Sequence, residues 1–134
     1  MRKIVFRGKS LRTEKWIQGY LFRCWERAYI AWGMVNDNAD MKEVDPETVC
    51  QYTGLTDKNS RKIFEGDMVR YTDEAIGKEK VDEIEYNETH AAFCRLHKSE
   101  RGLQYIFIDE SIANRCEVIG NIFDNPSLIG GKEK

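Results

Sequence analysis

The side chains best suited to catalysis or metal binding in this 134-residue chain are its two histidines and four cysteines. We interpret His90 and His97 as solvated turn residues, because no nucleophile, zinc-protease or phosphate-loop motif accompanies them. Cys94 and His97 come nearest to a ligand pair, but a spacing of three places them on opposite faces of a strand. Since no Cys-x-x-Cys pair occurs, we expect reduced, mostly buried cysteines and predict no catalytic residue, metal site or cofactor.

Carboxylates form a dense group over residues 82–88. This group lacks the ligand spacing and central glycine of a calcium-binding EF-hand loop, so we interpret it as a solvated acidic face. Its members are Asp82, Glu83, Glu85 and Glu88.

A second pair of carboxylates, Glu65 and Asp67, flanks Gly66. The pair could act as acid and base in a hydrolase. We favour a structural corner instead, in which Gly66 adopts a conformation closed to other residues and Asp67 accepts hydrogen bonds from backbone amides.

Basic residues are concentrated at the N-terminus, although the net charge is −2. Residues 1–30 carry eight Lys or Arg and two Glu, a local charge of +6, which leaves −8 on the remainder. This asymmetry indicates a basic face for nucleic acid, or a basic end that docks on an acidic surface of a second copy or another protein; two solvated faces are the remaining alternative. The candidate contact residues are Arg7, Lys9, Arg12, Lys15, Arg23 and Arg27.

Aromatic residues are interleaved with these N-terminal cations, as in proteins that stack single-stranded bases. Aromatics at strand spacing more often belong to a core. We therefore expect Trp16, Trp25 and Trp32 to pack in or beside an N-terminal β core. The predicted strands are 4–7, 16–22 and 23–34, the last with a turn near 26–27, followed by a loop over 36–42.

The segment 44–70 organises the rest of the chain. Asp57 and its neighbours are typical of a turn, because Asp and Asn bond their own backbone. The predicted strands here are 48–55, 61–64 and 68–71. The residues to which we assign structural turn roles in the whole chain are Asn59, Glu65, Gly66, Asp67 and Gly120.

Short strands separated by polar turns continue to the C-terminus. We expect Ile84 and Tyr86 to face the core and Asp109 to cap a helical turn that packs Ile112 inward. The predicted strands are 81–86, 91–96, 103–108 and 116–122, with turns over 72–80 and 97–102. The predicted fold is mainly β, with a small bent sheet or SH3-like barrel in the C-terminal part, an additional N-terminal β subdomain and few short helical turns.

Two long runs, residues 51–59 and 63–69, resemble the signature of the YopX family, small proteins of bacteriophages and prophages. Residues 117–126 form a third matching run, and 4–7 with 16–19 a weaker fourth, so the resemblance covers nearly the whole chain. The chain departs at Ser60, where the family usually has glycine. The resemblance implies a largely β fold and a phage context, but no established activity and no functional residues.

We therefore predict a non-enzymatic phage or prophage accessory protein that acts through self-assembly or protein binding. The alternative is a nucleic-acid-binding small β-barrel. The expected division is an N-terminal β subdomain (1–43), a YopX-like barrel core (44–129) and a disordered tail (130–134), folding as one cooperative unit. A homo-oligomer, or binding to a host or phage protein, is expected in the host cytoplasm. No apolar run long enough to span a bilayer and no signal peptide is apparent.

Overall fold

A computed structural model describes residues 2–36 and 38–128 of the chain. The predicted tail, residues 130–134, lies outside the described residues. The chain divides into two compact units, residues 1–52 and 53–134. The fold is mainly β, as predicted, with two antiparallel sheets and a single α-helix among the described residues. No helix in the described part of the chain is long and apolar enough to cross a membrane.

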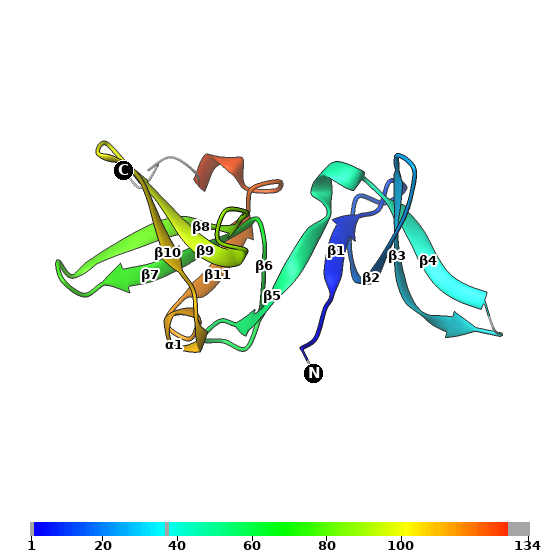
Figure 1. Ribbon diagram of the computed structural model, residues 1–134, viewed down its shortest axis with the longest axis horizontal. Coiled ribbons are helices and arrows are strands. Elements are labelled where there is room, and N and C mark those ends of the chain that lie inside the picture. Colours follow the sequence, from blue (N-terminus) through cyan, green and yellow to red (C-terminus); the bar gives the residue numbers. More distant parts are fainter. Residues whose placement is uncertain (1, 37, 129–134) are drawn as a thin grey trace. The chain divides into compact units, whose positions relative to one another are not determined.

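The first unit is an antiparallel sheet in which neighbouring strands are mostly consecutive in sequence (Figure 1). Its strands lie in the order β4-β3-β2-β1-β5, and β5 runs on into the second unit. The core consists of Ala28, Ile30 and Val44, which share one face because strand side chains alternate. The elements are β1 (Phe6–Lys9), β2 (Trp16–Cys24), β3 (Arg27–Val35), β4 (Asn38–Val44), the short 3-10 helix η1 (Pro46–Thr48) and β5 (Cys50–Thr56).

Two predictions for this unit are wrong. The predicted loop 36–42 is mostly strand, because β4 pairs with β3 along its length, from Val35↔Asn38 to Ala28↔Val44. Edge pairing of this kind supplies backbone hydrogen bonds that local composition does not reveal. Trp25 is 90% exposed at the β2–β3 turn and Trp32 is also exposed, so neither packs into the core.

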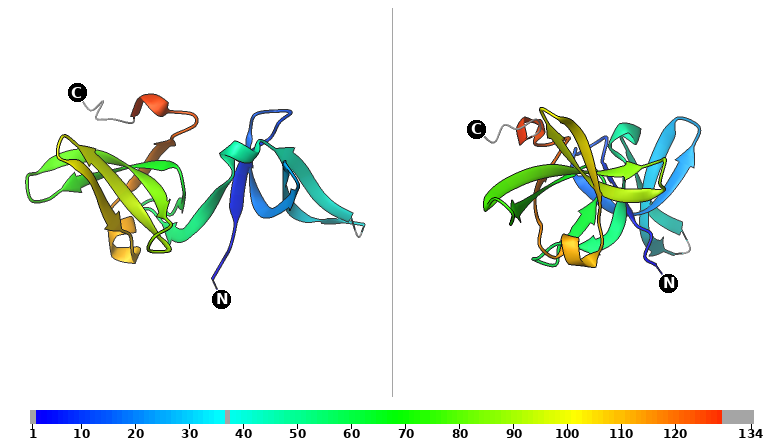
Figure 2. Two further views of the ribbon diagram at one scale, coloured as in Figure 1. Left: turned by 45° about the horizontal axis from the view of Figure 1, so that its top comes forward. Right: turned by 60° about the vertical axis from the view of Figure 1, so that its left-hand side comes forward.

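The second unit contains a five-stranded sheet in the order β10-β9-β8-β7-β11. β10 and β11 are its two edges, so these strands do not close into the predicted SH3-like barrel. The sheet's twist can be followed from β7 to β10 in Figure 2. The elements are β6 (Lys62–Phe64), β7 (Asp67–Asp73), β8 (Lys78–Asn87), β9 (Ala92–Ser99), β10 (Gly102–Phe107), α1 (Glu110–Ala113), β11 (Glu117–Asn121) and the 3-10 helix η2 (Pro126–Leu128).

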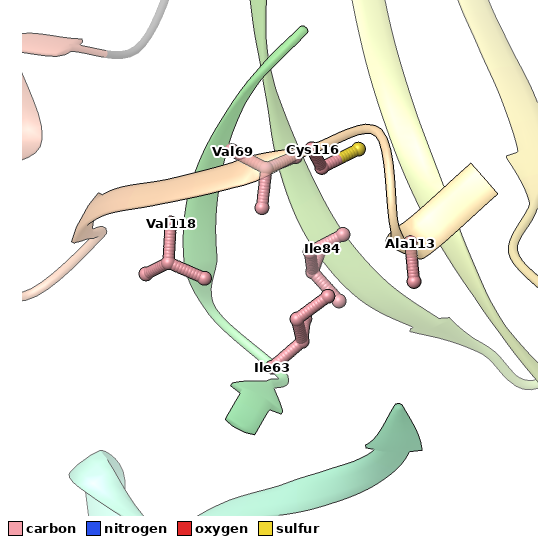
Figure 3. Close-up of a cluster of buried hydrophobic side chains, with 6 residues drawn as sticks. All are labelled: Ile63, Val69, Ile84, Ala113, Cys116 and Val118. Atoms are coloured by element: carbon pink, nitrogen blue, oxygen red, sulfur yellow. The ribbon is translucent and has the colours of Figure 1, made fainter. Parts of the chain in front are cut away.

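The core of the second unit joins β6, β7, β8, α1 and β11 (Figure 3). Its buried members are Ile63, Val69, Ile84, Ala113, Cys116 and Val118. Asp109 caps α1 as predicted, since its Oδ1 accepts a hydrogen bond from the Ile112 amide at 2.9 Å. This cap holds the helical turn so that Ala113 points into the cluster and Ile112 packs against it.

The strands of this unit are longer than predicted. β7 and β8 take up most of the predicted turn 72–80, and β9 continues to Ser99, so His97 lies in a strand rather than in a turn. Tyr86, expected in the core, is exposed towards the end of β8. The strands continue into polar residues because antiparallel pairing supplies backbone hydrogen bonds there, whereas the prediction relied on apolar residues.

Candidate functional site

The predicted N-terminal cations do not form one face. Arg7 and Lys9 lie on the same side of β1, with the Arg7 guanidinium carbon 4.5 Å and the Lys9 ammonium 5.6 Å from the centre of the Trp16 ring. The strand register brings these two cations to the Trp16 ring, because Lys9 is paired with Trp16 across β1 and β2. Arg7 is 9% exposed, so most of its surface is committed to the unit itself.

The other cations are dispersed. Arg27 is paired with Cys24 and therefore lies on the opposite side of the sheet from Arg23, whose side chain alternates with that of Cys24. Arg27 Nε lies 3.8 Å from Glu43 Oε2, and a hydrogen bond with Tyr29 and the charge of Glu43 raise its pKa. Arg12 and Lys15 are exposed in the β1–β2 turn.

One side of the first sheet carries exposed aromatic side chains. Tyr20 is 61% and Phe22 is 52% exposed, and the Phe22 ring lies 6.0 Å from that of Tyr29. Met41 lies on the same side, because Ala31 is paired with both Tyr20 and Met41. We call Tyr20, Phe22, Tyr29 and Met41 the aromatic face. Strand alternation directs these residues away from the core at Ile30, which leaves an apolar surface of the kind found at interaction sites.

A buried charged cluster in the second unit was missed by sequence reasoning. Asp82, interpreted as part of a solvated acidic face, is 2% exposed. Its Oδ1 lies 2.8 Å from His97 Nδ1, and its Oδ2 lies 3.0 Å from Arg95 Nε. The Arg95 guanidinium carbon lies 3.7 Å from the centre of the Tyr71 ring. We call Tyr71, Asp82, Arg95 and His97 the Asp82 cluster.

The sequence did contain a signal for this cluster. Asp82 alternates in phase with Ile84, so the predicted strand already pointed it towards the core. Arg95 and His97, two residues apart, share one face of β9, and a buried carboxylate needs such partners. The density of carboxylates around Asp82 obscured this signal.

Burial and hydrogen bonding hold the side chains in and beside this cluster in fixed positions and shift the pKa of two of them. Burial, followed by hydrogen bonding to Asp82, raises the pKa of Tyr71 above its usual range, so its phenol stays neutral. The hydrogen bond to Asp82 holds the His97 ring and leaves Nε2 for other contacts. Burial likewise raises the pKa of Cys116, which keeps this thiol protonated and unreactive.

A pocket of about 370 Å³ lies over this cluster, entirely within the second unit. Tyr71, Arg95 and His97 contribute to its wall. Gln104 from β10 and Arg115, which follows α1, also line it, together with polar side chains near the β7–β8 turn: Thr72, Asp73, Glu74 and Lys80.

The turn residues of the family signature stabilise the structure through hydrogen bonds to backbone amides. Asp57 is buried: its Oδ1 accepts hydrogen bonds from the amides of Asn59 and Arg61, each at 2.8 Å, and its Oδ2 accepts one from Val118 at 2.9 Å. Ser60, in the same turn, has a φ of 67°. The turn that contains Asn59 is therefore attached to β11.

The corner at residues 65–67 has the predicted structure. Gly66 has a φ of 86°, and Asp67 Oδ2 accepts a hydrogen bond from the Phe64 amide at 2.8 Å. Glu65 lies in this turn. Gly120, by contrast, is not a turn residue: it lies in β11 at a register shift, where a Cβ would come 2.7 Å from Asn125 Cγ, so close packing requires the glycine.

Comparison with known proteins identifies relatives over nearly the whole chain. The family described as YopX protein matches residues 5–130, which confirms the predicted resemblance. No curated protein matches. Among solved structures, the crystal structure of protein EF1440 from Enterococcus faecalis is similar, with 19% sequence identity and a TM-score of 0.51 over 97% of this chain and 100% of that chain. At this identity the likeness shows a shared fold.

Proposed function

The chain belongs to the YopX protein family, and we propose that it is a non-enzymatic phage accessory protein that acts through self-assembly or protein binding in the host cytoplasm. The binding surface is the aromatic face of the first sheet. Its occupant is a second copy of the chain or a host or phage protein.

The exposure of Tyr20 and Phe22 carries this proposal. Keeping large aromatic rings in water is unfavourable, and a partner that covers them removes this apolar surface from solvent. Aromatic residues are also enriched in protein interfaces. The +6 charge of residues 1–30 beside −8 on the remainder supports self-association, because two copies can place unlike charges together.

Light scattering after size-exclusion chromatography tests self-assembly. We expect a defined oligomer at low salt that Phe22→Ser dissociates, because this change removes an exposed ring from the aromatic face. High salt should loosen the oligomer if unlike charges contribute. Ile76→Ser is the matched control, since Ile76 is equally exposed but lies in the β7–β8 turn. A monomer at both salt concentrations, or equal effects of the two variants, would reject self-assembly through this face.

Single-stranded nucleic acid is the second candidate ligand. The observation in its favour is that Lys9 and Arg27 lie on the same side of the first sheet as Tyr20 and Phe22. Aromatic rings beside cations can stack bases while neutralising phosphates.

Fluorescence anisotropy of a labelled single-stranded oligonucleotide over a salt series tests this alternative. Arg27→Glu should weaken binding and reduce the salt dependence. Arg23→Glu is the matched control, because Arg23 lies on the opposite side of the same sheet. Equal weakening by both variants would argue for non-specific attraction, and absence of binding would reject nucleic acid.

A further inference from the structure

The pocket over the Asp82 cluster has no role in the proposed function and shares no residue with the aromatic face. Its walls come from β7, β8, β9, β10 and the end of α1. Ile106 and Ile112 form an apolar part of the wall. The remaining lining side chains are mostly polar or charged, so a ligand in this pocket would meet hydrogen-bonding and charged groups over most of the wall.

Among the described residues that line the pocket, one cation has no acidic partner. Lys80 Nζ lies 3.0 Å from Asp73 Oδ2, so these two side chains compensate each other. The buried Asp82 is compensated by Arg95. Arg115 differs, because its guanidinium contacts only neutral oxygens: Nε donates to the Ser111 carbonyl at 3.3 Å.

The acidic side chains at the rim do not cancel this cation. Within the described residues Arg115 has no ion pair with a carboxylate. Glu74 also lines the pocket, from the β7–β8 turn; it is exposed, as Arg115 is, and no ion pair joins these two side chains among the described residues.

Arg95 is held in a single orientation. Its side chain is 14% exposed, stacked on the Tyr71 ring and placed beside Asp82. Arg95 Nε lies close to Asp82 Oδ2 without directing its N–H at that oxygen, so the contact is an ion pair and not an aligned hydrogen bond. A guanidinium fixed in this way loses little conformational entropy when it binds a ligand.

We propose that this pocket binds an oxyanion group, phosphate or carboxylate, between Arg95 and Arg115. Guanidinium groups match the paired oxygens of both anions. The amide of Gln104 adds a neutral donor to the same lining. The ligand is therefore a small molecule or chain end that carries such a group.

Two-dimensional amide NMR of the full chain, titrated with inorganic phosphate and separately with acetate, tests the proposal. Sodium chloride is added to hold the ionic strength constant, so that screening alone changes nothing. We expect saturable shifts for the amides of Arg95, His97, Gln104 and Arg115. Saturation by phosphate alone identifies a phosphate ligand, and saturation by acetate alone identifies a carboxylate ligand; either result supports the site.

Two matched variants test the location. Arg115→Gln should weaken binding by about tenfold or more, because a charge-assisted hydrogen bond is lost. Arg101→Gln removes the same charge from the exposed β9–β10 turn and should leave the affinity unchanged. Unshifted amides away from the pocket confirm that each variant is folded. Equal weakening by the two variants, or no saturable shift up to about 50 mM of either anion, would overturn the proposal.

Discussion

Asp57→Asn is the sharpest test of how the signature turn supports the second unit. The buried carboxylate accepts two amide hydrogen bonds on Oδ1 and one on Oδ2. An asparagine amide has only one oxygen. With that oxygen kept on Asn59 and Arg61, the new NH₂ group faces the Val118 amide, and two donors then point at each other.

The magnitude follows from the burial of the third bond. Val118 is buried, so its amide cannot turn to water, and an unsatisfied buried donor costs about 1–3 kcal/mol. The two retained bonds also lose their ionic character, which is worth about 1 kcal/mol more. We therefore expect the free energy of unfolding to fall by about 2–4 kcal/mol.

The assay is denaturant unfolding followed by far-ultraviolet circular dichroism. Tryptophan fluorescence is unsuitable for the second unit, because Trp16, Trp25 and Trp32 all lie in the first. Asp109→Asn is the matched control. The Asp109 carboxylate accepts a hydrogen bond from the Ile112 amide at 2.9 Å, and Asn caps helices as well as Asp, so the loss should stay below about 0.5 kcal/mol. The reasoning is refuted if Asp57→Asn costs less than about 1 kcal/mol, or no more than Asp109→Asn.

Three further predictions concern Ser60, Tyr71 and Asp82. Ser60→Gly should stabilise the protein by about 0.5–1 kcal/mol in the same assay, because Ser60 has a φ of 67° and glycine adopts this conformation without a Cβ clash; a loss of that size would contradict the argument. Tyr71 should ionise above the ordinary range of a tyrosine in an ultraviolet titration, since burial and Asp82 raise its pKa. The contribution of this raised pKa to the free energy of unfolding is complete below about pH 10 and is lost as pH rises towards the folded-state pKa. Tyr71→Phe should therefore reduce the fall in the free energy of unfolding at alkaline pH. An unchanged fall would show that another group causes it. Asp82→Asn should lower the free energy of unfolding by about 3–5 kcal/mol, because the Arg95 Nε atom, which is shielded from solvent, loses its counter-charge. Asp73→Asn at the more exposed pair with Lys80 should cost less than about 1 kcal/mol, and similar losses for the two variants would disprove the role assigned to Asp82.

Local chemistry explains which features were predictable. Gly66 and Asp67 form their corner through backbone freedom and a bond to the Phe64 amide three residues away, and Asp109 caps α1 in the same local way. Such features depend on neighbours in sequence, so residue types are enough to find them. The same reasoning identified most strands and the family signature.

Long-range pairing explains what was missed. β4 forms from a polar segment because β3 supplies its hydrogen bonds, and only the register between β1 and β2 places Arg7 beside Trp16. Whether the basic residues share a face depended on this register and on that between β2 and β3, since a shift of one residue moves a side chain to the other side of the sheet.

The mainly β class, the family, the charge asymmetry and the turns at Asp57 and Gly66 could all be predicted from residue types alone, because each depends on composition or on residues close in the chain. Three features required the folded chain: Asp82 is buried against Arg95 and His97, Tyr20 and Phe22 are exposed, and Arg23 and Arg27 lie on opposite sides of their sheet. Burial and charge pairing arise between strands, and no single segment contains the register that joins them.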